Sequence, residues 1–248
     1  DWFDMNLVDK SLMNRPLYIH MDMSLSGDMT GIAGVWIKSK DVHSADKDAA
    51  NELHFRVAFS VSIKAPKGYQ ISFAKNRNFI YWLKQQGFKI KSVTTDTYQS
   101  ADTGQSLIAK GYNYKTLSVD RVDTQSHICL PYQYFRSCIY ENRLEVYESK
   151  TLTEEVIDLE RNFTTGKIDH PDGGRKDVCD ALCGAIFSAS KDAEQFGFDY
   201  GETLDDMLKA STPNSSDQTK KQVQIAFEEE LQNMFTPQSI KDLQKQTN

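Results

Sequence analysis

Three aspartates lie far apart in the sequence, and each stands at the end of a different expected element. Asp22 ends the apolar segment LYIHMD, Asp96 ends IKSVTTD, and Asp177 begins the segment DVCDALCGAIF. Oxygen ligands suit Mg²⁺ and Mn²⁺, and a pair of such ions can hydrolyse a phosphodiester bond. A single carboxylate at such a position is usually only a turn residue or a helix cap. The pattern therefore predicts a metal site only if the fold brings the three carboxylates together.

The first part of the chain has the periodicity of strands. Residues 17–24 alternate in polarity and place Asp22 on the same face as Tyr18 and His20. Residues 30–38 and 52–64 are rich in β-branched and aromatic side chains and predict two more strands. The connections favour an antiparallel meander. Asp28, in the SLSGD segment between the first two strands, is interpreted as a turn residue.

The period then changes to an alternation of helices and strands. This order is typical of βαβ units, so we expect parallel pairing in the second part of the sheet. The expected helices cover residues 71–86, 101–110, 124–141, 151–162 and 176–194, and the expected strands cover residues 89–95, 114–119 and 143–147.

The last expected helix has one face that is both small and acidic. Asp177, Asp180, Ala181, Gly184 and Ser188 recur at spacings of three and four and therefore share this face. Small side chains would let the helix lie close to the sheet and bring both acids towards the strand ends. The alternative is that Asp177 caps the helix and Asp180 is a surface acid, because acids are favoured in a first helical turn.

Composition restricts the class of protein. The chain has 248 residues, of which 39% are hydrophobic, and this is enough for a substantial core. No apolar run approaches the roughly 20 residues that span a membrane, and the beginning of the chain lacks the pattern of a signal peptide. Because it starts at Asp rather than Met, we interpret it as a piece of a longer protein. The four cysteines lack the spacing of a zinc site and are predicted to be free, mostly buried thiols in a reducing compartment.

Charge is distributed unevenly. The net charge is −6, but residues 199–248 hold 9 of the 35 acidic side chains and only 5 of the 29 basic ones, so the rest of the chain is nearly neutral. Residues 53–95 contain no acid at all. Such a stretch is suited to follow a phosphate backbone, although a solvated face balanced by acids elsewhere explains it equally well. Its basic side chains are Arg56, Lys64, Lys67, Lys75, Arg77, Lys84, Lys89 and Lys91.

The order of three antiparallel strands followed by alternating helices and parallel strands resembles the ribonuclease H-like α/β fold. Within it, the local sequences are similar to the nuclease domain of the large terminase subunit of tailed bacteriophages. Three segments carry this resemblance, which covers about residues 15–195: YIHMDMSLSGDMTGIAGVW, VTTDTYQSADTGQ and HPDGGRKDVCDALCGA.

The resemblance implies a metal-dependent endonuclease that cuts concatemeric viral double-stranded DNA by two-metal-ion hydrolysis. Asp22, Asp96 and Asp177 would be the catalytic, metal-binding acids, with Asp180 as a further ligand of two Mg²⁺ or Mn²⁺ ions. Lys176 is a departure, because many relatives have a second aspartate there. The expected DNA contacts are Lys64, Lys67, Lys75, Arg77 and Lys176.

The resemblance also predicts how the chain is organised and where it works. Residues 1–16 would lead in from a missing ATPase domain, 17–198 would form the nuclease domain, and 199–248 would be a linker and a helical tail. No ATP site is expected in this fragment, because the Gly-Lys pair at 166–167 lacks the rest of a phosphate-binding loop. The implied partners are the ATPase domain, a portal protein and a small terminase subunit. The implied location is the host cytoplasm and, transiently, the procapsid portal, without a membrane.

Two other functions fit the same residues. A junction resolvase or transposase-like core shares the acids but requires structure-specific recognition of DNA. A non-catalytic module for packaging or capsid docking would keep the fold without cutting. Cleavage of linear, nicked and branched DNA separates the first alternative, and Mn²⁺ titration separates the second.

Overall fold

The computed structural model describes residues 5–25, 29–41, 52–65, 67–97 and 100–195. The chain divides into two units, residues 1–198 and residues 199–248. The second unit lies entirely outside the described residues, as does Asp28. The expectations for the tail and for the turn at Asp28 therefore concern parts that are not described.

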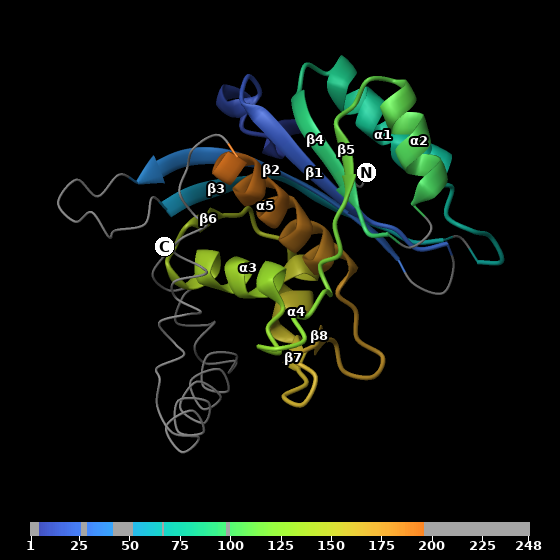
Figure 1. Ribbon diagram of the computed structural model, residues 1–248. Helices are drawn as coiled ribbons and strands as arrows, with labels where there is room; N and C mark the ends of the chain where they lie inside the picture. Colours follow the sequence, from blue (N-terminus) through green and yellow to red (C-terminus); the bar gives the residue numbers. More distant parts are fainter. Residues whose placement is uncertain (1–4, 26–28, 42–51, 66, 98–99, 196–248) are drawn as a thin grey trace. The chain divides into compact units, whose positions relative to one another are not determined.

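Six strands form one mixed sheet in the order β5-β4-β1-β2-β3-β6 (Figure 1). β1, β2 and β3 pair antiparallel, whereas β4 pairs parallel with β1 and with β5. The prediction of a meander followed by parallel strands is confirmed. The bounds are β1 (Pro16–Asp22), β2 (Thr30–Asp41), β3 (Glu52–Ile63), β4 (Lys89–Thr95), β5 (Tyr114–Thr116) and β6 (Leu144–Glu145).

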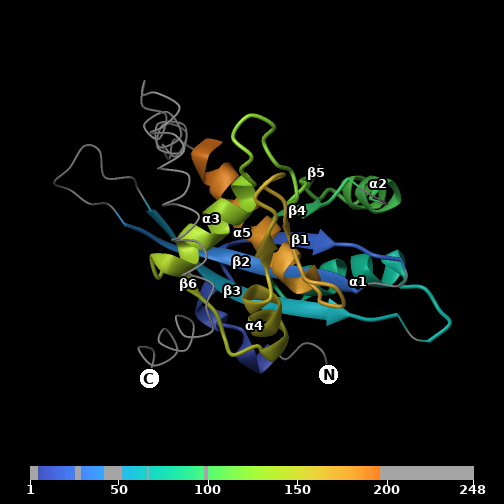
Figure 2. The ribbon, with the colours of Figure 1, turned by 90° about the horizontal axis from the view of Figure 1, so that it is seen from below.

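Helices cover both faces of this sheet. α5 packs across β1 to β4, and α3 and α4 pack against α5, while α1 and α2 lie on the opposite face (Figures 1 and 2). The bounds are α1 (Phe73–Gln85), α2 (Ala101–Ala109), α3 (Leu130–Tyr140), α4 (Lys150–Ile157) and α5 (Asp177–Gln195). Two short 3₁₀ helices, Met5–Leu7 and Lys10–Leu12, precede the sheet, and a small hairpin of β7 (Glu160–Arg161) and β8 (Ile168–Asp169) precedes α5.

The alternation along β1 assigns a different kind of residue to each face. Leu17, Ile19 and Met21 are fully buried in an apolar cluster that includes Phe79 and Ile80 of α1. This cluster also takes in Val8 and Leu12 from the expected lead-in segment. This apolar cluster thus lies between the sheet and α1, which leaves the other face of β1 for polar side chains.

That second face of β1 packs directly on α5. Tyr18 donates a hydrogen bond from its hydroxyl group to Asp192 of α5, at 2.7 Å. The ring of His20 lies against Gly184, where an added Cβ would come within 2.4 Å of the ring. Asp22 follows at the same two-residue period. The small face predicted for the last helix is therefore the face that meets the sheet.

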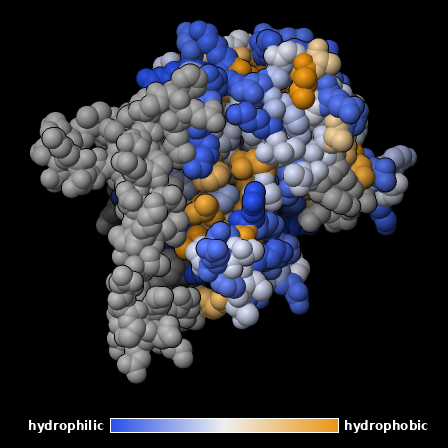
Figure 3. All heavy atoms as spheres, in the orientation of Figure 1, coloured by the Kyte–Doolittle hydropathy of each residue, from blue (hydrophilic) through white to orange (hydrophobic). Residues whose placement is uncertain are grey.

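The remaining surface exposes few large hydrophobic side chains. Among the described residues these are Tyr69, Ile108, Val146 and Phe163, which belong to separate segments. Figure 3 shows hydrophobic residues in small groups between hydrophilic ones on one face. None of the helices in the described ranges is long and apolar enough to cross a membrane. All four cysteines are buried and free, as predicted.

Several expected elements are shorter in the structure. The helix predicted over 124–141 begins only at Leu130, because Pro131 occupies its first turn and disfavours helix in the residues before it. Residues 123–127 instead form a turn in which Asp123 accepts hydrogen bonds from the backbone of Gln125 and Ser126. The strand predicted over 114–119 ends at Thr116.

The predicted end of the helix over 151–162 is also wrong. α4 stops at Ile157, and β7 begins three residues later. The strand predicted over 143–147 contains only Leu144 and Glu145. Strands of two residues are too short to show a period, so the β7–β8 hairpin had no sequence signal of its own.

We expect Gly184→Ala to destabilise the protein. Alanine gains helix propensity over glycine, but its methyl group would overlap the buried ring of His20. Overpacking of this kind costs about 1–3 kcal/mol, so the free energy of unfolding should fall in urea denaturation. Lys191→Ala, on the exposed side of the same helix, is the control and should stay within about 0.5 kcal/mol of the wild type. A Gly184→Ala protein as stable as the wild type would contradict the close contact.

Candidate active site

The strand register brings Asp22 and Asp96 to the same edge of the sheet. β1 and β4 are parallel neighbours in which Met21 lies beside Thr95, so the next residue of each strand is an aspartate. Asp96 also continues the alternation of Ser92 and Thr94, whose side chains contact α5 and His20. Asp22 therefore ends β1 and Asp96 directly follows β4, its neighbour in the sheet, on the side that faces α5.

A close approach of two backbones places the start of α5 at this edge. Asp22 pairs across the sheet with Gly31 of β2. A Cβ added to Gly31 would lie 1.9 Å from the carbonyl oxygen of Asp177. Only glycine leaves room for this contact, and it sets the first residue of α5 beside the end of β1. The fold thus brings Asp22, Asp96 and Asp177 together from three separate elements.

The acids interact electrostatically. Burial raises the pKa of Asp22 to about 8, and the nearby Asp180, Asp177 and Asp96 carboxylates add to this rise, against the opposite effect of Lys176. A carboxyl group with such a pKa is largely protonated at neutral pH when no cation is present. The cluster therefore carries more carboxylates than it can hold ionised by itself.

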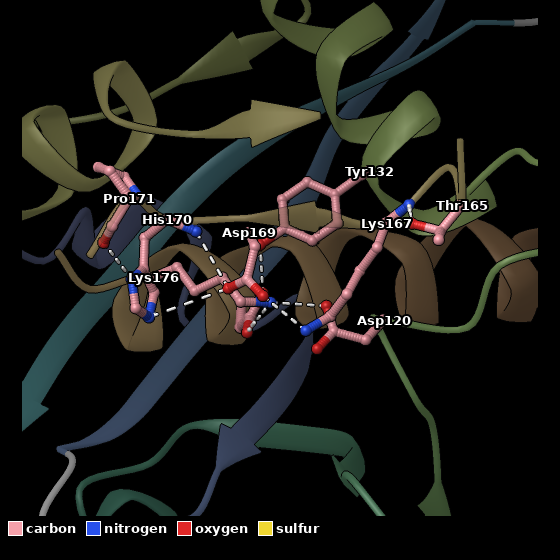
Figure 4. A network of polar contacts seen from close by, with 9 residues as sticks. Asp120, Tyr132, Thr165, Lys167, Asp169, His170, Pro171 and Lys176 are labelled. Atoms are coloured by element: carbon pink, nitrogen blue, oxygen red, sulfur yellow. Dashed lines mark hydrogen bonds and ion pairs between the residues drawn. The ribbon is translucent and has the colours of Figure 1, made fainter. Parts of the chain in front are cut away.

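Lys176 takes part in a network of polar contacts that also includes Asp120 (Figure 4), and Asp180 belongs to the same network. The ammonium nitrogen of Lys176 lies 2.6 Å from Oδ1 of Asp120 and 3.1 Å from Oδ2 of Asp180. The hydroxyl group of Tyr132 donates a hydrogen bond to Oδ1 of Asp180, and the Tyr132 ring centroid lies 5.7 Å from the same ammonium nitrogen. Asp180 is thus held on two sides by donors from the protein.

The charged groups of this network shift one another's pKa values. Burial alone would lower the pKa of Lys176, but the Asp180 and Asp120 carboxylates outweigh burial and raise this pKa well above its usual value. Burial raises the pKa of Asp180 to about 6, while the ammonium group of Lys176 and the hydroxyl group of Tyr132 limit the rise. The two acids therefore keep the ammonium group of Lys176 charged in its buried position.

A second buried acid supports the start of α5. Glu155 of α4 accepts a hydrogen bond from the backbone nitrogen of Cys179, at 2.8 Å. This nitrogen is in the first turn of α5, where backbone donors lack partners within the helix. Glu155 therefore caps α5 from another helix and helps fix the position of Asp177 and Asp180.

Sequence reasoning missed three members of this site: Asp120, Tyr132 and Glu155. Glu155 had a signal, because it lies three residues after the buried Leu152 and so falls on the buried side of α4. Asp120 and Tyr132 had none. They lie 56 and 48 residues from their partners in the chain, and no local pattern relates them.

His20 is a core histidine. The hydroxyl group of Thr94 donates to the carbonyl oxygen of Ile19, so the oxygen of Thr94 accepts the hydrogen bond from Nδ1 of His20, at 2.8 Å. Complete burial lowers the pKa of His20 to about 4, against the opposite effect of Asp96. His20 is therefore neutral and joins β1 to β4 just behind the acids.

The carboxylate oxygens of this cluster are the kind of ligand that hard divalent cations prefer. Oxygen donors from four aspartates interact at one edge, and their repulsion would be relieved by positive charge. In the described ranges, however, no three His, Cys, Asp or Glu side chains lie in an arrangement ready to hold one ion. Asp96 accepts hydrogen bonds from its neighbour Thr97, and Asp180 is held by Lys176 and Tyr132. A bound cation would have to compete with these contacts.

The expected DNA contacts are found in different surroundings. Lys64 and Lys67 are exposed in the segment after β3. Ile63, the last residue of β3, pairs with Thr30, which is next to Gly31. Lys75 is exposed at the start of α1. Arg77 forms an ion pair with Asp102 of α2. Lys176 is buried in the network described above and so does not form part of an open basic surface.

Solved structures of phage terminase nucleases have a fold similar to that of this chain. The large terminase nuclease from thermophilic phage G20c with bound magnesium matches 69% of this chain and 80% of its own, with 15% identity and a TM-score of 0.50. The nuclease domain of the Thermus phage P74-26 large terminase matches 70% of this chain and 79% of its own, with 14% identity and a TM-score of 0.50.

The large terminase of bacteriophage HK97 matches 69% of this chain but only 39% of its own length, with 13% identity and a TM-score of 0.50. At these identities the likeness concerns the fold, and the chain has the ribonuclease H-like fold that these nucleases share. No known sequence family and no curated protein matches the sequence.

We expect Tyr132→Phe to lower the free energy of unfolding by about 1–3 kcal/mol, because Asp180 is a buried carboxylate that would lose a hydrogen-bond donor. Urea denaturation measures the loss. Tyr18→Phe is a matched control that removes a hydroxyl donor to Asp192 at a partly buried position, and its effect should be smaller. Equal losses in the two variants would contradict a special role for the buried network.

Proposed function

We propose that this chain is the nuclease domain of a phage large terminase and cuts double-stranded DNA with the help of divalent cations. The observation that carries the proposal is the convergence of Asp22, Asp96 and Asp177 at one edge of a ribonuclease H-like sheet. The likeness in fold to terminase nucleases, one of them with bound magnesium, supports it.

The proposed metal-binding residues are Asp22, Asp96 and Asp177, with Asp180 next to them on α5. Two bound Mg²⁺ or Mn²⁺ ions would supply activation of a water molecule and stabilisation of the leaving 3′ oxygen. The protein's own part is to hold the carboxylates in place. The contact of Gly31 with Asp177 and the cap from Glu155 fix the two acids of α5, while the bond of His20 to Thr94 joins the two strands that carry Asp22 and Asp96.

The biological setting follows from the same proposal. The substrate would be concatemeric viral DNA, cut during genome packaging in the host cytoplasm. An ATPase domain of the same protein, a portal protein and a small terminase subunit would be the partners. Lys64, Lys67 and Lys75 are proposed to contact the DNA backbone, because the first two lie in the segment that leaves the sheet at the edge of the acids and the third follows it closely. The backbone nitrogen of Ile71 donates to the carbonyl oxygen of Leu25, which ties this segment to the loop after Asp22.

We expect Asp96→Ala and Asp22→Asn to abolish DNA cleavage while the protein stays folded, because each removes a proposed ligand of the catalytic cations. Cleavage of linear DNA with Mg²⁺, Mn²⁺ or EDTA measures activity, and circular dichroism measures folding. Asp102→Asn, an exposed acid on α2, is the control and should cut like the wild type. Full cleavage by folded Asp96→Ala protein, or cleavage in EDTA, would rule out the proposal. The same cleavage assay on nicked and branched DNA distinguishes a terminase nuclease from a junction resolvase, which should prefer the branched substrate.

We expect the double substitution of Lys64 and Lys67 by Ala to weaken DNA binding and to reduce its dependence on salt. Each lost phosphate contact lowers the slope of log K against log salt concentration by about 0.9. Fluorescence anisotropy at several salt concentrations, in Ca²⁺ to prevent cleavage, measures both quantities. Lys89→Ala, an exposed position at the opposite end of β4 from Asp96, is the control. An unchanged slope in the double variant would show that the DNA takes another path.

A further inference from the structure

Lys176 is a cation that the chain itself places among its buried acids. Its side chain and that of Asp180 are only 10% and 7% exposed, and its ammonium nitrogen contacts carboxylate oxygens of both Asp120 and Asp180. A surface ion pair contributes little, but removing one partner of a buried pair leaves an uncompensated charge. The position of this ammonium group therefore matters for every carboxylate near it.

The contacts of Lys176 fix Asp180 in one place. The two residues are one helical turn apart, and the backbone nitrogen of Asp180 donates to the carbonyl oxygen of Lys176, at 2.7 Å. Tyr132 of α3 holds the other carboxylate oxygen, and Asp120, from the segment between β5 and α3, completes the set around the ammonium group. Three elements thus meet at one positive charge, and a metal ion at Asp180 would have to compete with both donors.

We propose that Lys176 is a positioning residue whose ammonium group occupies a cation position between Asp120 and Asp180, and so keeps Asp180 out of the set of metal ligands. This inference deepens the proposed function and rests on it. The cations would be held by Asp22, Asp96 and Asp177, while Asp180 acts through its neighbours. The sequence spacing puts Asp177 and Asp180 on one face. The contacts of Asp180 with Lys176 and Tyr132 are the reason for assigning the two acids different roles.

The test is to count bound Mn²⁺ in the absence of DNA. Lys176→Met keeps the length of the side chain but removes its charge, which leaves two carboxylates on either side of the former ammonium position. We expect this variant to bind one more Mn²⁺ per chain than the wild type, measured by electron paramagnetic resonance of the free ion. Mn²⁺ should also raise its melting temperature more than that of the wild type. Lys176→Arg retains the charge and should keep the wild-type count.

Further variants distinguish the possible outcomes. Adding Asp180→Asn to Lys176→Met should remove the extra ion. A wild-type count in Lys176→Met, with a melting temperature lowered equally in EDTA and in Mn²⁺, would mean that Lys176 only stabilises the fold. If Lys176→Met does not fold, bound Mn²⁺ is counted in Lys176→Gln instead. A wild-type protein that binds no Mn²⁺ would contradict the proposed function. A wild-type count in the uncharged variant, with Mn²⁺ binding lost in Asp22→Asn, would contradict this inference alone.

Discussion

The close packing of α5 on the polar face of β1 is the constraint on which the site depends. It is possible because two positions lack side chains: Gly184 receives the ring of His20, and Gly31 receives the backbone of Asp177. These contacts lie at two points along the helix, so they determine both its distance from the sheet and the position of its first turn. A helix held only by larger side chains would stand further away, and its acids would not reach the strand ends.

This packing creates an electrostatic cost that other residues offset. Burial and mutual repulsion act on Asp22, Asp177 and Asp180 together, and the raised pKa of Asp22 shows the result. Lys176 supplies one positive charge, Tyr132 supplies a hydrogen-bond donor, and the N-terminus of α5 favours negative charge near it. These contributions stabilise Asp180 more than Asp22, whose carboxyl group lies at the end of β1. The remaining repulsion is the physical reason why a cation would bind at this edge.

The sequence allowed the main elements and the approach of the acids to be predicted, because both follow from local periods. Alternation along residues 17–24 assigned Asp22 to the face that meets α5, and the small face of residues 177–188 identified the side of α5 that meets the sheet. The start of α3 at Leu130 was missed, because a turn stabilised by Asp123 replaced the expected helix before Pro131. The contact between Lys176 and Asp120 joins residues 56 positions apart, and no spacing rule relates such a pair.

The same contrast explains why Asp177 and Asp180 differ although sequence spacing treats them alike. Both are buried on one face of α5, but Asp177 is next to Gly31 and the end of β1, whereas Asp180 lies three residues further along and meets Tyr132 and Lys176. A helical period predicts which side of a helix a residue faces, and it says nothing about which neighbours other elements bring there. For α5, those neighbours are a strand end in one case and a buried ammonium group in the other. The role of each acid therefore depends on long-range contacts, and these can be assigned only once the sheet and the helices are placed.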